Sequence, residues 1–351
     1  MRNLFATMSA SPQLAGHLVI RAPNWVGDLV MATPVLEAAA AASSPFERVT
    51  VLVRGHLAPV LAGGPVAAHV HALDKGADET ALYRELGADV ALLLSSSFGA
   101  ALRAFRAHVP ARLGVNLHRR GMLLTHKLTP ATHAGRRVAT PTANLLRDVG
   151  ALAGLFPPTL HPVLHVTDAD ATRAAELLAT AGFEADEPFI VCCPGAAFGA
   201  AKLWPPPRFA EAIEALHARH GWRTLVTGGP GEERLMDAVA AAAPAAVSLS
   251  AEARDLGSLK SLVKHARLLL VGDSGPRWYA AAFDTPCVSV MGPNLPELTA
   301  TSLEVAEIVR KDGLACSPCL ERVCPLEHHA CMVEIPSSQV VAAAERVLGL
   351  V

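Results

Sequence analysis

Short apolar runs alternate with alanine-rich, helix-like segments along most of the chain. Short runs of apolar and β-branched residues are typical of buried strands, whereas a period near 3.6 residues indicates helices. Strands that alternate with helices in this order predict an α/β fold with parallel, doubly wound sheets. The predicted strands are residues 17–21, 48–53, 89–94, 189–193, 222–227, 268–271 and 287–291. The predicted helices begin near residues 28, 170, 207 and 277.

The alternation stops and restarts near the middle of the chain. A proline-bearing stretch, residues 157–162, marks a linker between two similar halves. We therefore expect two Rossmann-like domains, residues 1–160 and 161–335, that face a central cleft. The carboxyl ends of both sheets would meet at this cleft, where open α/β sheets bind their ligands. Residues 336–351 are expected to form a C-terminal helix that packs back toward the N-terminal domain.

Proline and a polar turn interrupt two of these segments. Pro34 lies inside the first helical pattern and predicts a kink or a new helix start close to Thr33. The turn Gly272-Asp273-Ser274-Gly275 ends the strand at 268–271, and Ser274 or Asp273 is expected to cap the following helix. Backbone N–H groups of such a turn point to one place, which suits a phosphate. The turn predicts the edge of a nucleotide site, although turns that bind nothing have the same pattern.

Composition narrows the class of protein. Hydrophobic residues make up 51% of the 351 residues and charged ones 18%, which indicates a globular protein with large buried sheets. The net charge of −2 gives no indication of nucleic-acid binding, and none is expected. No apolar run is as long as a membrane span, and the first residues lack the layout of a secretory signal. We therefore expect a cytoplasmic protein whose seven cysteines are thiols or metal ligands before they are disulfides.

Two turns carry groups that suit catalysis or phosphate binding. Asp28 ends Asn24-Trp25-Val26-Gly27-Asp28, where a carboxylate at a helix start suits a general base or a simple helix cap. Lys202 lies in the small-residue loop after the strand at 189–193, whose backbone can approach a phosphate while the lysine supplies positive charge. The loop lacks the Gly-Lys-Ser/Thr ending of a Walker A motif. A surface lysine on an ordinary connection is the alternative.

Two acidic motifs need separate interpretations. The strand at 222–227 leads into Gly228-Gly229-Pro230-Gly231-Glu232-Glu233, and either glutamate can accept hydrogen bonds from a ribose. A simple turn with an acidic first helical turn explains this pattern equally well. Asp168-Ala-Asp170 has the form of a metal-binding Asp-x-Asp, but Thr167 before it predicts a helix cap instead. A metal-dependent mechanism is therefore not favoured.

Four cysteines lie close together near the end of the chain. Cys316 and Cys319 form a Cys-x-x-Cys, and Cys324 and Cys331 follow at a spacing tighter than in common zinc modules. A structural clip, made by a metal ion or by disulfides, and plain free thiols are equally consistent with this pattern. No metal is expected in catalysis.

Long motifs spread from residue 18 to residue 331 carry a family resemblance. They are VIRAPNWVGDLVMATPVLEA, PGAAFGAAKLWPPPRFAEAI, the Asp-Ser-Gly turn with its alanine-rich helix and VMGP, and CSPCLERVCPLEHHAC. With them the chain resembles the ADP-heptose:lipopolysaccharide heptosyltransferases, glycosyltransferase family 9, and within it the heptosyltransferase II branch. The resemblance implies a GT-B architecture, with the donor in the C-terminal domain and a lipid-linked acceptor against the N-terminal domain. It also implies an inverting, metal-independent transfer.

The resemblance implies roles for individual residues. Asp28 matches the family's proposed catalytic base, and Lys202 matches the lysine that contacts the donor diphosphate. The expected donor-binding residues are Lys202, Gly228, Glu232, Asp273, Ser274, Gly275 and Trp278, and the expected acceptor-binding residues are Asn24, Trp25, Arg119 and Arg120. The basic stretch 112–137 suits an anionic acceptor, although an exposed charged face has the same pattern.

The expected partners are an ADP-sugar and a lipid-linked glycan at the inner face of the cytoplasmic membrane, without a cofactor. Two positions depart from the family pattern: Trp278 stands where a histidine is usual, and Asn294 replaces the threonine of Gly-Pro-Thr. A GT-B enzyme with another nucleotide sugar or acceptor is therefore one alternative. A degenerate member that binds nucleotide or glycan without turnover is another, although the presence of Asp28 and Lys202 argues against it. A Rossmann oxidoreductase is disfavoured because no G-x-G-x-x-G follows the first strand.

Overall fold

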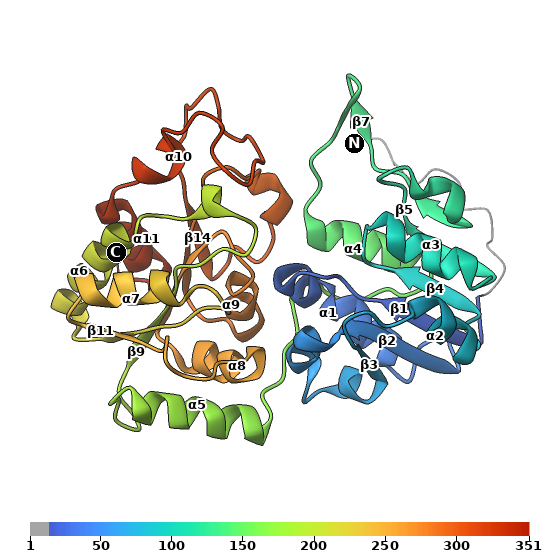
Figure 1. Cartoon of the computed structure of the whole chain (residues 1–351), viewed down its shortest axis with the longest axis horizontal. Coiled ribbons are helices and arrows are strands. Elements are labelled where there is room, and N and C mark those ends of the chain that lie inside the picture. Colours follow the sequence, from blue (N-terminus) through green and yellow to red (C-terminus); the bar gives the residue numbers. More distant parts are fainter. Residues whose placement is uncertain (1–13, 351) are drawn as a thin grey trace.

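Two parallel six-stranded sheets organise the molecule, one in each half of the chain (Figure 1). The structure is a computed structural model that describes residues 14–350, apart from the side chain of Arg136. The strand order is β3-β2-β1-β4-β5-β6 in the first sheet and β11-β10-β9-β12-β13-β14 in the second. Both are the doubly wound order of a Rossmann fold. The predicted α/β fold with two Rossmann-like halves is confirmed.

The first sheet and its helices form the N-terminal domain. A short antiparallel hairpin, made of β7 and β8, stands apart from this sheet. The strands are β1 (His17–Arg21), β2 (Arg48–Arg54), β3 (Val70–Leu73), β4 (Val90–Leu93), β5 (Ala111–Val115), β6 (His126–Leu128), β7 (Thr132–His133) and β8 (Arg136–Arg137). The helices are α1 (Val26–Ala40), α2 (Glu79–Glu85), α3 (Phe98–Arg106) and α4 (Thr142–Ala151), with 3-10 turns η1 (Gly55–Leu61), η2 (Pro65–His69) and η3 (Arg120–Leu123).

The second sheet and its helices form the C-terminal domain. The strands are β9 (Phe189–Cys193), β10 (Arg223–Val226), β11 (Ala246–Ser248), β12 (Leu268–Gly272), β13 (Cys287–Val290) and β14 (Ala306–Val309). The helices are α5 (Asp168–Thr180), α6 (Pro206–His220), α7 (Glu233–Ala242), α8 (Leu256–His265), α9 (Arg277–Phe283), α10 (Ala330–Val333) and α11 (Ser337–Val347), with 3-10 turns η4 (Ala200–Lys202) and η5 (Pro296–Thr299). No helix within residues 14–350 is long and apolar enough to cross a membrane.

The central strands explain why the strand predictions succeed. β1, β9 and β12 are buried along their whole length, as expected for parallel strands covered by helices on both faces. Continuous apolar runs therefore mark them clearly in the sequence. The predicted strands at 17–21 and 189–193 have the bounds of β1 and β9, and the others end within about two residues of their predicted ends.

Helix α1 passes through Pro34 without a break. A proline has no N–H, so the carbonyl of Val30 loses its helical donor. The Thr33 hydroxyl donates to that carbonyl at 2.8 Å instead. The same hydroxyl accepts a hydrogen bond of 2.8 Å from the N–H of Val163 in the linker. The predicted helix start near Thr33 is therefore wrong, because this side chain supplies the donor that proline lacks.

A buried lysine of the C-terminal domain contacts the N-terminal domain. Lys260 of α8 is fully buried, donates to the carbonyl of Ala62 after η1 at 3.1 Å and pairs with Asp170 at 2.9 Å. Asp170 also belongs to a capping box at the start of α5, in which it and Thr167 exchange hydrogen bonds of 2.9 and 3.1 Å. The predicted helix cap is confirmed, and the Asp-x-Asp pair serves the fold of α5.

The C-terminal helix packs differently from the expectation. α11 lies against α6, β13 and β14 of its own domain, with Val340, Val341 and Ala344 buried there. Its polar side pairs with the same domain, because Glu345 accepts a 2.9 Å hydrogen bond from His220. These contacts place α11 on its own domain, whereas the sequence led us to expect packing toward the N-terminal domain.

Candidate functional site

A pocket of about 570 Å³ lies between the two domains. The N-terminal domain contributes the start of α1, and the C-terminal domain contributes the loops that follow β9, β10, β12 and β13. These are the carboxyl ends of parallel strands, where doubly wound sheets bind ligands. Every residue predicted for catalysis or donor binding lines this pocket: Asp28, Lys202, Gly228, Glu232, Asp273, Ser274, Gly275 and Trp278.

Asp28 lies in the first turn of α1. The helix begins at Val26, and Trp25, its N-cap residue, makes no side-chain cap. Asp28 accepts no hydrogen bond from any residue in the described part of the chain, so it does not act as the helix cap. Burial raises the pKa of Asp28 to about 6, although the positive charge of Lys202 opposes that shift. A carboxylate without hydrogen-bond donors and with a pKa near neutrality has the properties of a general base.

Lys202 joins three loops of the C-terminal domain. Its Nζ lies 2.7 Å from Oδ2 of Asp273 and donates to the backbone carbonyl of the same residue at 3.3 Å. Asn294 donates to that Oδ2 from the loop after β13 at 2.9 Å. The Lys202 ammonium also lies 4.7 Å from the ring centre of Phe198. The network holds the Lys202 ammonium at the pocket wall, where it can also contact an anionic ligand.

The turn after β12 approaches α1 closely. Pro276 is the N-cap residue of α9, so the predicted capping by Ser274 or Asp273 is wrong. The Ser274 hydroxyl is buried and has no hydrogen-bond partner among residues 14–350. A Cβ on Gly275 would lie 2.9 Å from Cβ of Val26, which leaves no space for a side chain. The small residues of this turn therefore let the two domains touch beside the pocket.

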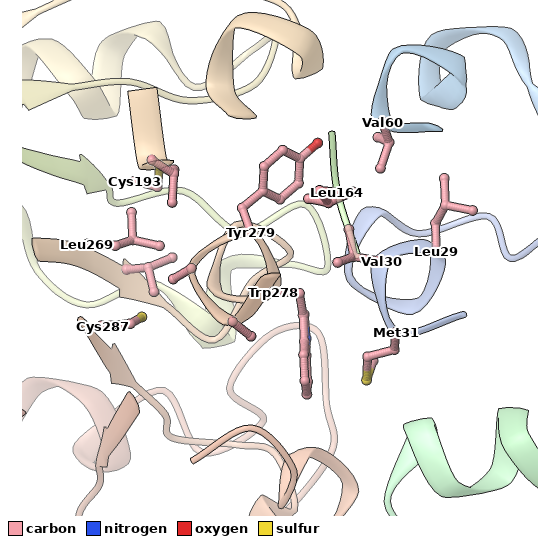
Figure 2. Close-up of a cluster of buried hydrophobic side chains, with 14 of the residues drawn as sticks. Leu29, Val30, Met31, Val60, Leu164, Cys193, Leu269, Trp278, Tyr279 and Cys287 are labelled. Atoms are coloured by element: carbon pink, nitrogen blue, oxygen red, sulfur yellow. The ribbon is translucent and has the colours of Figure 1, made fainter. Parts of the chain in front are cut away.

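Trp278 forms part of the same contact. Its side chain is only 4% exposed, and a Cβ on Gly27 would lie 2.7 Å from its Cδ1 atom. Figure 2 shows Trp278 of α9 opposite Met31 of α1. The guanidinium of Arg277 lies 4.6 Å from the centre of the indole ring. Trp278 is thus both a wall of the pocket and a packing surface for the N-terminal domain.

The structure distinguishes the two adjacent glutamates. Glu232 lines the pocket and accepts a hydrogen bond of 2.7 Å from the N–H of Gly229. A Cβ on Gly195 would lie 2.0 Å from its carboxyl carbon, so the carboxylate sits directly against the loop after β9. Burial raises the pKa of Glu232. Glu233 instead pairs with Arg254 at 2.9 Å and does not line the pocket.

The predicted acceptor residues do not gather in the pocket. Trp25 lines it and is 47% exposed, whereas Asn24 accepts hydrogen bonds from Arg21 and Arg54 at 3.0 and 2.9 Å. Arg120 is fully buried, donates to the carbonyl of Val115 at 2.8 Å, and burial lowers its pKa to about 10. The acceptor role of Arg120 is therefore wrong, because its guanidinium holds the backbone after β4 and β5 together. Arg119 is exposed and lies outside the pocket lining.

The segment 316–331, which carries four cysteines, contacts the loop that holds Lys202. The sequence did not predict this role. The carbonyl of Arg322 accepts a 3.0 Å hydrogen bond from Ala201, and Nε2 of His329 lies 2.7 Å from the Ala201 carbonyl. The guanidinium of Arg322 also lies 5.1 Å from the centre of the Phe198 ring. The segment thus holds the residue before Lys202 on both of its backbone polar groups.

The four cysteines of this segment are free thiols in the structure. Cys331 is buried, and burial raises its pKa to about 11, with the other three thiols as a smaller contribution. Within residues 14–350 no three His, Cys, Asp or Glu side chains are arranged to hold a metal ion. The structural clip made of Cys316, Cys319, Cys324 and Cys331 stays a prediction.

Comparisons with known proteins agree with this architecture. The profile described as glycosyltransferase family 9 (heptosyltransferase) matches residues 80–330. Lipopolysaccharide heptosyltransferase 2 of Salmonella typhimurium is 27% identical over 310 residues, which cover 84% of this chain and 87% of that protein. The solved structure of Escherichia coli ADP-heptose lps heptosyltransferase II has 23% identity and a TM-score of 0.72, and covers 95% of this chain and 98% of its own. A glycosyl transferase family 9 structure from Veillonella parvula has 20% identity and a TM-score of 0.78, with 97% and 99% covered.

Proposed function

Because the chain belongs to glycosyltransferase family 9 (heptosyltransferase), we propose that it transfers a heptose from ADP-heptose to the inner core of a lipopolysaccharide. Family membership makes the protein a glycosyltransferase, and relatives named lipopolysaccharide heptosyltransferase 2 support the sugar and the acceptor. One observation carries the proposal. Asp28 of the N-terminal domain and Lys202 of the C-terminal domain line the same pocket, close enough for the lysine charge to lower the pKa of the carboxyl.

In the proposed reaction Asp28 is the general base. It accepts the proton of an acceptor hydroxyl, whose oxygen attacks the anomeric carbon of the donor from the face opposite ADP. The bond between the anomeric carbon and the diphosphate oxygen breaks, and the configuration at that carbon inverts. Negative charge develops on the departing ADP, and Lys202 stabilises it from the pocket wall. The proton ends on Asp28 and the electron pair on the diphosphate.

The donor is proposed to bind the C-terminal domain. Glu232 is suited to accept hydrogen bonds from the ribose, since its carboxylate lies in the pocket between the loops after β9 and β10. The turn of Asp273, Ser274 and Gly275 lies beside Lys202 and would face the diphosphate. The unpartnered Ser274 hydroxyl is a donor available for a phosphate oxygen. Gly228 keeps the Glu232 side chain close to the loop, because a Cβ there would lie 2.7 Å from its Oε2.

The acceptor is proposed to approach from the N-terminal domain. Trp25 is exposed at the pocket edge and offers an apolar ring face to a sugar. Asn24 would act through the turn, since Arg21 and Arg54 fix its side chain. Arg119 is available on the surface for an anionic group. A lipid-linked acceptor would place the reaction at the inner face of the cytoplasmic membrane.

A transfer without a metal ion agrees with the chemistry of the pocket. Metal-dependent transferases neutralise the diphosphate with a cation held by carboxylates, whereas here the ammonium of Lys202 supplies positive charge at the wall. The Asp168-Ala-Asp170 pair lies at the start of α5 and does not line the pocket. Asp170 accepts a hydrogen bond from the N–H of Thr167 and forms an ion pair with Lys260.

A different donor sugar is a second candidate, and Trp278 favours it. Its indole ring lines the pocket and offers one N–H and a broad apolar face, unlike the hydrogen-bonding histidine expected from the family. Asn294, the other departure, donates to Asp273 in the same wall. Both changes alter the hydrogen bonds available to a donor without altering Asp28 or Lys202.

Thermal stability with nucleotides distinguishes these candidates. A ligand that binds only the folded protein stabilises it by about 2.7 kcal/mol at a hundred times its dissociation constant. We expect a shift with ADP and a larger one with ADP-heptose at matched concentrations. Shifts with UDP or GDP conjugates alone would identify another donor. The absence of a shift with any nucleotide would favour a degenerate, non-catalytic member.

The turnover of the Asp28→Asn variant tests whether Asp28 is the general base. The variant should lose about 10²–10⁴-fold in turnover while ADP still stabilises it. Turnover of the wild type should rise with pH through about 6 and then level, because the base acts only when ionised. An Asn variant that transfers at nearly the wild-type rate would disprove the assignment.

A further inference from the structure

Positive charge is concentrated in one part of the N-terminal domain. Between Asp89 and Asp148 the sequence has nine Lys and Arg residues and no Asp or Glu. The other residues of the chain have 21 basic and 32 acidic side chains, so they carry a net charge of −11. The small net charge of the whole chain is therefore the sum of a basic segment of 58 residues and an acidic remainder. Such a segregation of charge creates a local positive field even when net charge is small.

This basic segment builds one edge of the N-terminal sheet. It comprises β4, α3, β5, η3, β6 and the β7–β8 hairpin, and β6 is the outermost strand. Helix α3 contacts η3, and β6 pairs with β5. Figure 1 shows α3, β5 and the hairpin together in the part of this domain away from β3. We call this surface the β6 edge, and β3 forms the opposite edge of the same sheet.

Several cations of the β6 edge have no acidic partner. Arg106, Arg119, Lys127 and Arg137 are exposed, and none makes an ion pair within the described residues. Four other arginines of the segment are engaged elsewhere: Arg103 pairs with Glu79, Arg147 pairs with Asp148, and Arg112 and Arg120 donate to backbone carbonyls. The unpaired cations are thus available to an external anion.

Large apolar side chains are exposed among these cations. Phe98 and Phe105 of α3 are each 44% exposed, and Met122 of η3 is 83% exposed. Val138 follows Arg137 after the hairpin and is 42% exposed. Single exposed apolar residues are common on protein surfaces. Their combination with unpaired cations, in a segment that has no carboxylate of its own, is the composition of surfaces that lie on anionic membranes.

We propose that the β6 edge docks the enzyme onto an anionic phospholipid bilayer. The four unpaired cations contact headgroup phosphates, while Phe98, Phe105 and Met122 enter the zone between headgroups and acyl chains. The inference deepens the proposed function and rests on it for the lipid-linked acceptor, which such docking would bring to the pocket. A soluble polyphosphate would satisfy the cations but not the exposed apolar side chains.

Binding of the full chain to vesicles tests the proposal. We expect flotation with phosphatidylcholine vesicles that contain phosphatidylglycerol, weakened by salt, and none with phosphatidylcholine alone. Each cation near an anionic surface contributes about fivefold in affinity, so the triple variant Arg106→Gln, Lys127→Gln, Arg137→Gln should bind about 10²-fold more weakly. Met122→Gln should weaken binding on its own. Arg119 is kept, because it has a proposed role toward the acceptor.

A matched control variant loses the same number of positive charges outside the β6 edge. Lys75 lies just beyond β3, at the opposite edge of the sheet, and Lys264 and Arg267 lie in the C-terminal domain. All three are exposed and make no ion pair within the described residues. The triple variant Lys75→Gln, Lys264→Gln, Arg267→Gln should float like the wild type. The proposal would be overturned if both triple variants weakened vesicle binding equally. It would also be overturned if Met122→Gln bound vesicles as well as the wild type does.

Transfer to a detergent-dispersed acceptor separates this proposal from the proposed function. Met122→Gln, which leaves every cation of the basic stretch in place, should transfer at the wild-type rate in detergent and more slowly to an acceptor in anionic vesicles. Unchanged transfer in both settings, without vesicle binding, would refute docking and leave the proposed function intact. Failure of the wild type to transfer in detergent would instead count against the proposed function.

Discussion

Replacing Asp28 with asparagine should make the protein more stable at high pH. The folded protein raises the pKa of Asp28 from 3.8 to about 6, because burial disfavours the charged form. A shift of about two units corresponds to about 3 kcal/mol of folding free energy at about 1.4 kcal/mol per unit. The ionised carboxylate therefore opposes folding, as expected of a group retained for reactivity rather than stability.

The size of this stabilisation depends on pH. Well below the unfolded pKa of 3.8 both states hold the proton, and the penalty is absent. It grows as pH rises toward about 6 and is complete above that value. Asp28→Asn removes the ionisation, so the variant should gain up to about 3 kcal/mol over the wild type at alkaline pH and little near pH 4. For a domain of this size the gain is about 6–12 °C in Tm at most.

Thermal unfolding across this pH range is the appropriate assay. The difference in Tm between variant and wild type, followed against pH, isolates ionisation from any pH-independent cost of the amide. Asp186→Asn is the control, because Asp186 is exposed and should give a flat difference. If the difference in Tm between Asp28→Asn and the wild type is also independent of pH, burial does not raise the pKa of this carboxyl group. The prediction would then be wrong.

Three further predictions concern the groups around the pocket. Lys202→Met should lower turnover on the order of 10²-fold or more, measured with saturating donor, because the departing diphosphate loses its positive partner; an unchanged rate would remove Lys202 from the mechanism. Gly195→Ala should cost about 1–3 kcal/mol of stability and weaken the thermal shift with ADP, because its Cβ would meet the Glu232 carboxylate. Lys260→Met should lower stability by about 3–5 kcal/mol in thermal unfolding, because Asp170 loses its buried partner. Lys264→Met on the same helix is exposed and should have little effect, so equal losses would contradict the role of the buried pair.

Most of the fold could be predicted because its signals are local. Each central strand is buried on both faces, so its apolar run is uninterrupted. The loops that build the pocket follow such strands directly, and parallel strands end at a common edge. Asp28, Lys202 and the Asp273 turn could therefore be grouped from the amino-acid sequence alone. Glu232 could not be separated from Glu233, since only the folded chain places one carboxylate against Gly195 and pairs the other with Arg254.

The failures of prediction involve partners that are distant along the chain. Arg120 looks like a surface cation in the sequence, but the backbone after β4 and β5 surrounds it. Pro34 looks like a helix break, but the neighbouring Thr33 replaces the missing donor and also holds the linker. Arg322 and His329 lie in a recognisable motif, but the motif does not indicate their contact with Ala201, which lies more than a hundred residues away. Residue type alone does not specify which carbonyl a long side chain reaches.

The contact between α1 and α9 explains why the site needs both domains. Gly27 leaves space for the Trp278 ring, and Gly275 leaves space for Val26, so the two helix starts meet without intervening side chains. This contact brings Asp28 of one domain to the wall that holds Lys202 and Asp273 in the other. Trp278 belongs both to this contact and to the pocket lining. A change at Trp278 would therefore alter the pocket and the packing of the domains together, and the choice of donor is physically coupled to the domain contact at this residue.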